Sequence, residues 1–299
     1  MIKYNNNTIG DWNFGDDNVK KVYVNESLCY QTFEFVAPPP AEKDYFRFIS
    51  RGDGTFTFFA NKANSGNTLS YSIDNGSTWT ALGNGEESPS LSSGDIIMWK
   101  GSNHTINGGG IGTFSSTTNF DVVGNIMSLH YGDNFEGETD LTDKNNAFMN
   151  LFSGCTTVIN ASGMTLPATT LSTQCYCNMF NRASNLETPP LLTAATTLTT
   201  GCYQNMFYCY PSSNTLKTEE SYFLPALTLV QNCYSQMFYG RSSVNKITCL
   251  ATSGINSNGS TNNWLYNTSS TGTFTRTANV TWPTNSSGRK DWTLVNYQP

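Results

Sequence analysis

Hydrophobic and polar residues alternate along the chain between residues 45 and 129. The alternation is clearest in four short stretches, at 46–48, 55–58, 69–73 and 120–122. A period of two places successive side chains on opposite faces of a strand, and the intervening Gly, Asn and Asp residues favour turns. The pattern therefore predicts an antiparallel β-sandwich of roughly seven to nine strands over residues 41–130.

A different pattern begins near residue 145. A six-residue signature, Cys-Tyr-x-x-Met-Phe, recurs at 175–180, 202–207 and 233–238, with a degenerate copy at 147–152. The copies start 28, 27 and 31 residues apart, and a second motif, Leu-Pro-Ala-Thr-Thr-Leu at 166–171, returns with them. Cys and Met lie four positions apart, as do Tyr and Phe, which predicts a short helix with these residues on its buried face.

Proline limits the length of these predicted helices. Pro167, Pro189 and Pro190 exclude a continuous helix, so each repeat is expected to be one helix, a turn and one short strand. Repeats of this kind bury their apolar sides by stacking on one another. We therefore expect a short solenoid over residues 131–255.

The two ends of the chain differ from its centre. Residues 22–24 and 29–33 alternate like a hairpin around Asn25 and Glu26, and Pro38 to Pro40 form a stiff spacer. Residues 1–40 are thus expected to be an attachment segment, although an edge hairpin of the sandwich would have the same pattern. At the other end, strands at 273–276, 280–282 and 292–295 are expected to cap the solenoid within residues 256–299. The expected fold class is mixed α and β.

The signature and its partner motif resemble the BspA-like leucine-rich repeat, which is found in surface proteins of gut Bacteroidales and of the crAss-like phages that infect them. Segments at 72–79, 94–101 and 124–129 are similar to the β-domain that precedes such repeats, and those at 263–265, 272–274 and 291–295 resemble the family's closing segment. The resemblance implies a BspA-like solenoid and a protein that binds or displays. It supplies no catalytic residue.

Composition points to a polar but weakly charged surface. Charged residues make up 13% of the chain, its net charge is −6, and Asn, Ser and Thr together form about a third of it. Such a surface suits hydrogen bonding to glycans or to other copies of the chain, and it argues against nucleic acid as a partner. Neither a signal peptide after Met1 nor a membrane-spanning stretch is expected.

Eight cysteines are present, and three of them recur once per repeat. These three, Cys175, Cys202 and Cys233, are expected to be reduced and buried, because helix axes about 8–10 Å apart hold equivalent residues too far apart for a disulfide. Cys175 and Cys177 lack the further ligands that a metal site needs, so no metal or other cofactor is expected.

Catalytic chemistry finds little support in the residues. Residues 72–79 fit an Asp-box hairpin, and Arg51-Gly52-Asp53 fits a tight turn better than an integrin-type ligand. The histidines, His104 and His130, accompany no nucleophile motif. An acidic run could bind calcium or could be a solvated linker, and it comprises Asp133, Glu136, Glu138, Asp140 and Asp143.

Aromatic residues give the better functional lead. Four tyrosines follow the signatures or lie in the longer third repeat, namely Tyr208, Tyr210, Tyr222 and Tyr239. Exposed tyrosines among Asn and Thr would form a surface for carbohydrate or protein contacts, unless they cap the core instead.

The family resemblance, the lack of a visible signal peptide and the weakly charged polar surface together predict a non-enzymatic virion surface protein, such as a head fibre or a decoration of the capsid or tail. It would be made in the host cytoplasm, contact capsid or tail proteins through residues 1–40, and display its other domains for adhesion to host glycans. Fibres of this class are usually homo-oligomers, most often trimers. The alternative is a secreted or surface-anchored bacterial leucine-rich-repeat adhesin.

Overall fold

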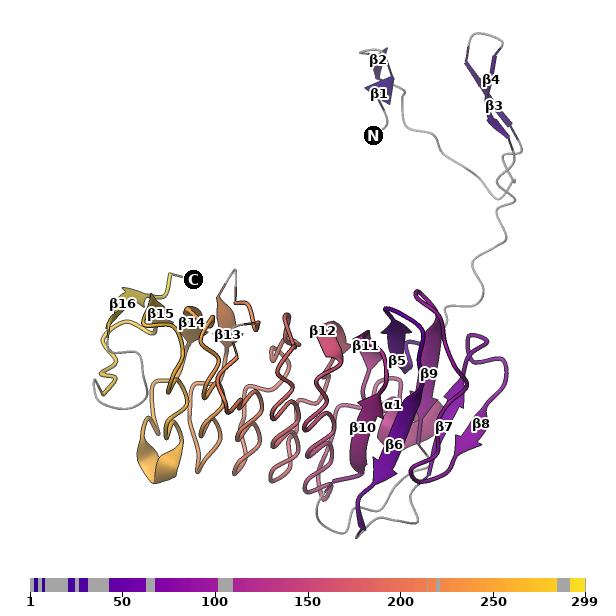
Figure 1. Ribbon diagram of the computed structural model, residues 1–299. Helices are drawn as coiled ribbons and strands as arrows, with labels where there is room; N and C mark the ends of the chain where they lie inside the picture. The colour runs from indigo at the N-terminus through magenta and orange to yellow at the C-terminus, as the bar shows by residue number, and fades with distance from the viewer. Residues whose placement is uncertain are drawn as a thin grey trace. The chain divides into compact units, whose positions relative to one another are not determined.

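The computed structural model describes residues 3–4, 7–8, 21–24, 27–31, 43–62, 68–101, 110–213, 215–218, 221–283 and 291–298. The chain divides into two compact units, Met1–Lys43 and Asp44–Pro299 (Figure 1).

In the first unit, β1 (Lys3–Tyr4) pairs with β2 (Asn7–Thr8), and β3 (Lys21–Val24) pairs antiparallel with β4 (Ser27–Gln31). The expected pairing of these last two segments is confirmed. The turn that joins them and the spacer from Pro38 to Pro40 lie outside the described residues.

The second unit begins with a six-stranded sheet of order β12-β11-β5-β9-β7-β8. Its strands are β5 (Phe46–Ser50), β7 (Leu69–Ser72), β8 (Thr80–Leu82), β9 (Ile96–Lys100), β11 (Phe120–Asn125) and β12 (Val158–Thr165). Neighbours run antiparallel except β11 and β12, which are parallel. The four alternating stretches of the sequence lie on strands, as predicted.

A two-stranded ribbon covers the core side of this sheet. It consists of β6 (Phe56–Ala60) and β10 (Gly112–Ser116), paired antiparallel. Phe48 of the sheet lies at the centre of the aromatic contacts, with its ring centroid 4.9 Å from that of Phe114 and 5.3 Å from that of Phe56. The alternation therefore orients one face of each strand toward a shared aromatic core.

The signatures of the repeat are turns, and the prediction of one helix per repeat is wrong. Among the described residues the only α-helix is α1 (Ser128–Tyr131), which is followed by the 3-10 turn η2 (Gly132–Asn134); a second 3-10 turn, η3 (Ser257–Gly259), comes later. Left-handed backbone recurs at every fourth residue through the signatures: φ is 55° at Gln174, 56° at Asn178 and 59° at Arg182. A regular α-helix has no place for such residues.

Hydrogen bonds explain why the spacing of four appears without a helix. Every second backbone N–H crosses to the next repeat, as from Tyr176 to the carbonyl of Cys202, while the N–H groups between them bond three residues back. In the turn from Tyr176 to Met179, the left-handed residue is third, which is the arrangement of a type II turn. Asn suits this position because it tolerates positive φ better than most residues.

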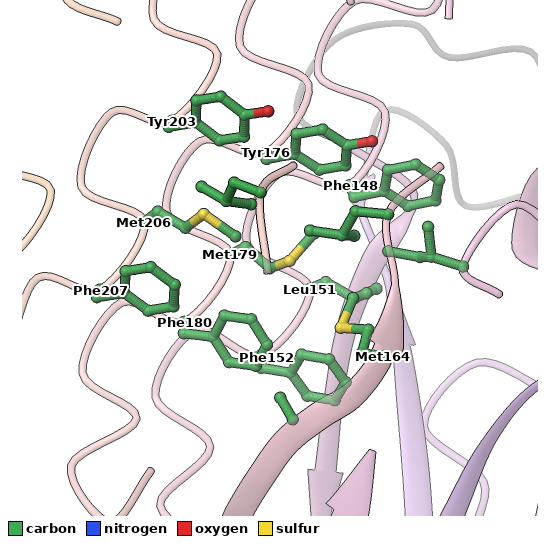
Figure 2. Packing of buried hydrophobic residues seen from close by; sticks show 14 of the residues in the cluster. Phe148, Leu151, Phe152, Met164, Tyr176, Met179, Phe180, Tyr203, Met206 and Phe207 are labelled. Atoms are coloured by element: carbon green, nitrogen blue, oxygen red, sulfur yellow. The ribbon is translucent and has the colours of Figure 1, made fainter. Parts of the chain in front are cut away.

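The repeats stack in register, and their side chains form continuous rows (Figure 2). Phe148, Tyr176 and Tyr203 are nearly parallel, with centroids 5.7 and 5.6 Å apart. A second row contains Phe152, Phe180, Phe207 and Phe238, with neighbouring centroids 5.2–5.8 Å apart. The second row reaches the sheet because Phe152 also contacts Phe114 and Phe120.

The structure adds a fifth copy that the sequence pattern did not identify. Tyr234 and Phe238 donate their N–H groups to the carbonyls of Ser260 and Trp264, as in the earlier copies. Trp264 stacks on Tyr234 with centroids 6.2 Å apart. Residues 260–265 thus continue the stack, rather than belonging to a closing segment.

A four-stranded parallel sheet is formed by strands that come after the third, fourth and fifth copies in the sequence, in the order β13-β14-β15-β16. Its strands are β13 (Tyr222–Leu224), β14 (Lys246–Cys249), β15 (Thr271–Arg276) and β16 (Asp291–Asn296). Two of the expected C-terminal strands are therefore present, whereas residues 280–282 form none.

The fold is thus mostly β, and the expected mixed α and β class with a BspA-like leucine-rich-repeat solenoid is wrong. The physical reason is the left-handed residue in each turn, which redirects alternate N–H groups from the same turn to the neighbouring repeat. The two-residue alternation correctly indicated strands, and the repeat period correctly indicated a repeating unit, but the local conformation of the signature was predicted wrongly.

Cys175, Cys202 and Cys233 are free and buried, as predicted. The reason differs from the one expected, because the stacked rings show repeats much closer together than two helices would be. Burial raises the pKa of Cys175 to about 12 and that of Cys233 to about 11. These thiols act as small apolar core residues.

Candidate functional site

The candidate site consists of the residues that directly follow the last three signatures. This residue is Tyr208 in the third copy, Tyr239 in the fourth and Tyr266 in the fifth. Each donates its backbone N–H to the carbonyl three residues back, so the three positions are equivalent. Because the repeats are in register, the equivalent side chains lie one above the other. We call these three residues the tyrosine ladder.

The rings of the tyrosine ladder stack on the surface. The centroids of Tyr208 and Tyr239 are 4.8 Å apart, those of Tyr239 and Tyr266 are 4.9 Å apart, and both pairs are inclined by 25°. Tyr208 and Tyr239 are half-buried, and Tyr266 is 43% exposed. The rings of the two buried rows are stacked in the same way, one ring per repeat. The ladder is therefore a third row of this kind, at the surface.

Backbone hydrogen bonds between repeats hold the ladder in place. The N–H of Cys209 donates to the carbonyl of Tyr239, and that of Gly240 donates to the carbonyl of Tyr266. Gly240 has a φ of +76°, and a Cβ there would collide with the carbonyl oxygen of Cys209. Glycine is therefore required directly after the middle tyrosine, both for its conformation and for the close approach of the preceding repeat.

A buried arginine, two residues after Tyr239, joins the backbones of neighbouring repeats. Arg241 is fully buried, and its guanidinium donates to the carbonyls of Phe207 at 2.6 Å and of Ala183 at 2.8 Å. A longer contact of 3.4 Å reaches the carbonyl of Phe180. One side chain thus joins the second, third and fourth repeats. Burial lowers the pKa of Arg241 to about 10.

The turns that carry the ladder are almost free of charge. Segments 201–213, 231–245 and 254–270 contain no acidic residue, and their one charged side chain is that of Arg241, which is directed inward. Asn267, which directly follows Tyr266, is exposed, as is Asn262, four residues before Tyr266. The ladder therefore presents phenols and neutral polar groups.

The phenol of Tyr239 remains neutral over a wide pH range. Its pKa is raised above the usual value, first by partial loss of solvent and then by the nearby phenols. Those phenols belong to Tyr266, Tyr208 and Tyr210. Tyr210 is 59% exposed, so four tyrosines gather at this part of the surface.

Three of the four tyrosines predicted from the sequence meet at this surface, and the fourth does not. Tyr222 lies on β13, is buried, and donates its hydroxyl to the carbonyl of Pro190 at 2.6 Å. Its ring packs edge-on against Phe207 and Phe238, so its inclusion in the surface was wrong. Tyr222 points inward from its strand and covers the row that contains Phe207 and Phe238.

Tyr266 is the member that sequence reasoning missed. Its repeat has Thr261 where the others have tyrosine and Trp264 where they have methionine, which hides the signature. The left-handed Asn263 and Asn267, four residues apart, repeat the spacing of the other copies. A search for Asn or Gln at this spacing would have found the fifth copy.

The Asp-box hairpin is structural, as expected. Asp74 accepts hydrogen bonds from the N–H and the hydroxyl of Thr78, which together lower its pKa to about 2. Gly76 has a φ of +81°, and the indole of Trp79 donates to its carbonyl. The box closes the connection between β7 and β8.

Arg51, Gly52 and Asp53 connect β5 to β6. The guanidinium of Arg51 forms an ion pair with Asp121 of β11 at 2.8 Å, and its backbone N–H bonds to the carbonyl of Asn119. Arg51 is therefore engaged by the neighbouring strand, in agreement with the prediction of a tight connection.

The acidic run takes part in local structure. Asp133 accepts hydrogen bonds from Lys100 and from the hydroxyl of Tyr45, and Asp140 accepts one from the N–H of Thr142. Within the described ranges, no group of three His, Cys, Asp or Glu side chains could hold a metal ion. His130 is buried beside Phe148, and His104 lies outside the described residues.

Comparison with protein-family models, with curated proteins and with solved structures finds no match to this chain. In the part of the chain that the structure describes, no helix is long and apolar enough to cross a membrane.

Proposed function

We propose that this chain is a non-enzymatic surface protein of a virion and that it binds glycans of the host surface through the tyrosine ladder. The observation that carries the binding part is the row of stacked, partly exposed tyrosines on a regular stack of repeats. The virion part rests on the motif resemblance and on the polar, weakly charged composition.

Tyrosine suits such a surface because its ring is apolar and its hydroxyl forms hydrogen bonds. It also has few rotatable bonds, so little conformational entropy is lost on binding. In the ladder this entropy is reduced further, since each ring is already restrained by its neighbour. A preorganised surface of this kind favours binding of a ligand that is itself polar and flexible.

The binding test compares the full-length protein with a variant that carries Tyr208→Ala, Tyr239→Ala and Tyr266→Ala. Wild type is expected to bind host cell-surface polysaccharide, and the triple variant is expected to lose that binding while retaining its β-rich circular dichroism. Tyr71→Ala is the matched control, because Tyr71 is half-buried on β7, away from the repeats. Equal binding by wild type and the triple variant would contradict the role of the ladder.

The location is tested by mass spectrometry of purified virions from the source of this gene. Peptides of the chain are expected in the particles, together with those of capsid and tail proteins. If the chain were absent from particles and present on a bacterial cell surface, the adhesin alternative would replace the virion proposal.

Attachment through residues 1–40 is part of the proposal. Residues 1–43 form a compact unit of their own, with strands of two to five residues. Such short hairpins are marginally stable alone and gain order from a partner. Removing residues 1–40 is expected to leave thermal melting of the rest unchanged and to abolish incorporation into particles or homo-oligomer formation. Normal assembly of the truncated chain would contradict this role.

A further inference from the structure

The tyrosine ladder leaves its hydroxyls, rather than its ring faces, available to a ligand. Tyr239 has Tyr208 on one face and Tyr266 on the other, at centroid distances of 4.8 and 4.9 Å. At these separations the rings are in contact, so no sugar can lie flat on the middle ring. Within the described part of the chain, the three phenol hydroxyls form no hydrogen bond to another protein group.

The ligand that matches this surface is neutral. The three segments that carry the ladder contain one charged side chain, Arg241, whose guanidinium donates to buried carbonyls. Within these three segments a polyanion would find no accessible cation with which to pair, and the exposed Arg182 belongs to the second copy, beyond the row. A chain of sugar hydroxyls, in contrast, can donate to and accept from phenols and the neighbouring amides.

The spacing and the length of the ladder define the shape of the ligand. One tyrosine is presented per repeat at a separation of 4.8–4.9 Å, which is similar to the advance of one sugar residue along an extended chain. The row has an end, because the second copy has Asn181 at the equivalent position, where its N–H bonds to the carbonyl of Asn178.

Resting on the proposed function, we propose that the ladder binds a neutral, unbranched polysaccharide that lies along the stack, with one sugar residue per tyrosine, held by the phenol hydroxyls. Tyr239 then contributes through its hydroxyl as the central subsite. The three tyrosines define three subsites, and sugar residues beyond them add little.

The test measures binding of neutral oligosaccharides to the full-length protein by calorimetry. Glucan, mannan and xylan series are used, from the monosaccharide to the hexasaccharide, with sialylated and sulfated chains for comparison. Affinity is expected to rise with each sugar residue up to the trisaccharide and then to level off. Tyr239→Phe is expected to weaken binding about threefold to tenfold, the range for the loss of one hydrogen bond.

Two further variants sharpen the test. Tyr71→Phe removes a hydroxyl outside the ladder and is expected to bind like wild type. Asn181→Tyr adds an equivalent tyrosine in the second copy, next to Tyr208, and is expected to move the plateau from the trisaccharide to the tetrasaccharide. Both substitutions preserve the backbone hydrogen bonds, and a thermal melt verifies that each variant is folded.

The outcomes separate this inference from the proposed function. Glycan binding that does not depend on chain length, that is unchanged in Tyr239→Phe, or that favours charged chains would overturn the inference and leave a glycan-binding protein. If no glycan of any series binds and the ladder variants leave cell binding unchanged, both proposals are wrong.

Discussion

The sheet and the repeat stack of the second unit bury aromatic rings in different ways. In the sheet, Phe48 meets Phe114 edge-on at 85°, and its contacts come from strands far apart in the sequence. In the stack, Tyr176 and Tyr203 are within 9° of parallel, and each ring touches the equivalent ring of the next repeat. In the sheet core each ring packs against a different set of neighbours, whereas in the stack the same ring-on-ring contact is made in every repeat.

This difference has consequences for stability. When each repeat contacts only its neighbours, stability is approximately the sum of repeat and interface contributions. A loss in the middle of the stack should therefore remain partly local. A loss in the sheet core removes contacts among several strands at once and should act on the whole sheet.

The largest effects are expected from truncating the core rings. Phe48→Ala and Phe207→Ala each remove a fully buried ring, and each should lower the free energy of unfolding by about 3–5 kcal/mol. Hydrogen exchange should show faster opening of the whole sheet for Phe48→Ala, and of the second to fourth copies for Phe207→Ala. Phe59→Ala, at a ring that is 51% exposed, is the control, with a change below about 0.5 kcal/mol. Identical exchange patterns for the two core variants would remove the distinction between the regions.

Arg241 tests whether a single polar side chain joins several repeats. Arg241→Ala leaves the carbonyl of Phe207 without the Arg241 donor, at a cost of about 1–3 kcal/mol. It also removes one of the two donors to the carbonyl of Ala183, which still accepts from the N–H of Leu186. Relief of the buried charge offsets part of this cost, so we expect a net loss of about 2 kcal/mol in chemical denaturation. Arg182→Ala, at an exposed cation, should change stability by less than about 0.5 kcal/mol. A loss no larger than that of the control would show that the stack does not need this connection.

Alkaline pH should loosen the stack before the sheet. Seven of the eight cysteines lie between residues 155 and 249, and burial raises the pKa of Cys175 and of Cys249 to about 12. A folded-state pKa above the unfolded value of 9.0 means that the contribution is complete below pH 9 and is lost as pH rises toward 12. Each such thiol should cost up to about 1.4 kcal/mol per pH unit in this window.

Two measurements follow this effect. The fluorescence of Trp264 should change at lower pH than that of Trp99 when single-tryptophan variants are titrated. Thiol labelling at neutral pH should be negligible in the folded protein and complete after denaturation. Rapid labelling of Cys202 in the folded state would show that the row is accessible.

The smallest effect is the most direct test of turn against helix. Asn205 has a φ of 53°, so Asn205→Ala should cost about 1 kcal/mol while Asn205→Gly should be nearly neutral. A helix would give the opposite order, because alanine is the best helix former and glycine one of the poorest. Gln204→Ala, at the half-buried residue before it, is the control. Alanine tolerated better than glycine at 205 would restore the helical interpretation.

Much of the arrangement was readable from the sequence. The alternating stretches became β5, β6, β7 and β11, and the repeat period placed equivalent residues in register. The burial of Cys175, Tyr176, Met179 and Phe180 was also expected, because they are the constant positions of the signature. Three of the four candidate tyrosines were found by their position after a signature.

The conformation of the signature was not readable from its spacing. Apolar residues four apart fit a helix, and they fit equally well a chain of four-residue turns with one left-handed residue each. The side-chain pattern is the same in both. The Asn and Gln residues at Asn150, Asn178, Asn205 and Gln236 contained the distinguishing signal, since all four have positive φ.

The sequence by itself determined which residues repeat, which of them are apolar, and how little charge the surface has. Tertiary structure decided the rest: that alternate N–H groups bond between repeats, that Tyr222 is buried, and that Tyr266 joins the ladder. The physical reason is that a turn of this kind satisfies only half of its hydrogen bonds locally. The other half need a neighbouring repeat, so the conformation and the surface row exist only when the repeats are stacked.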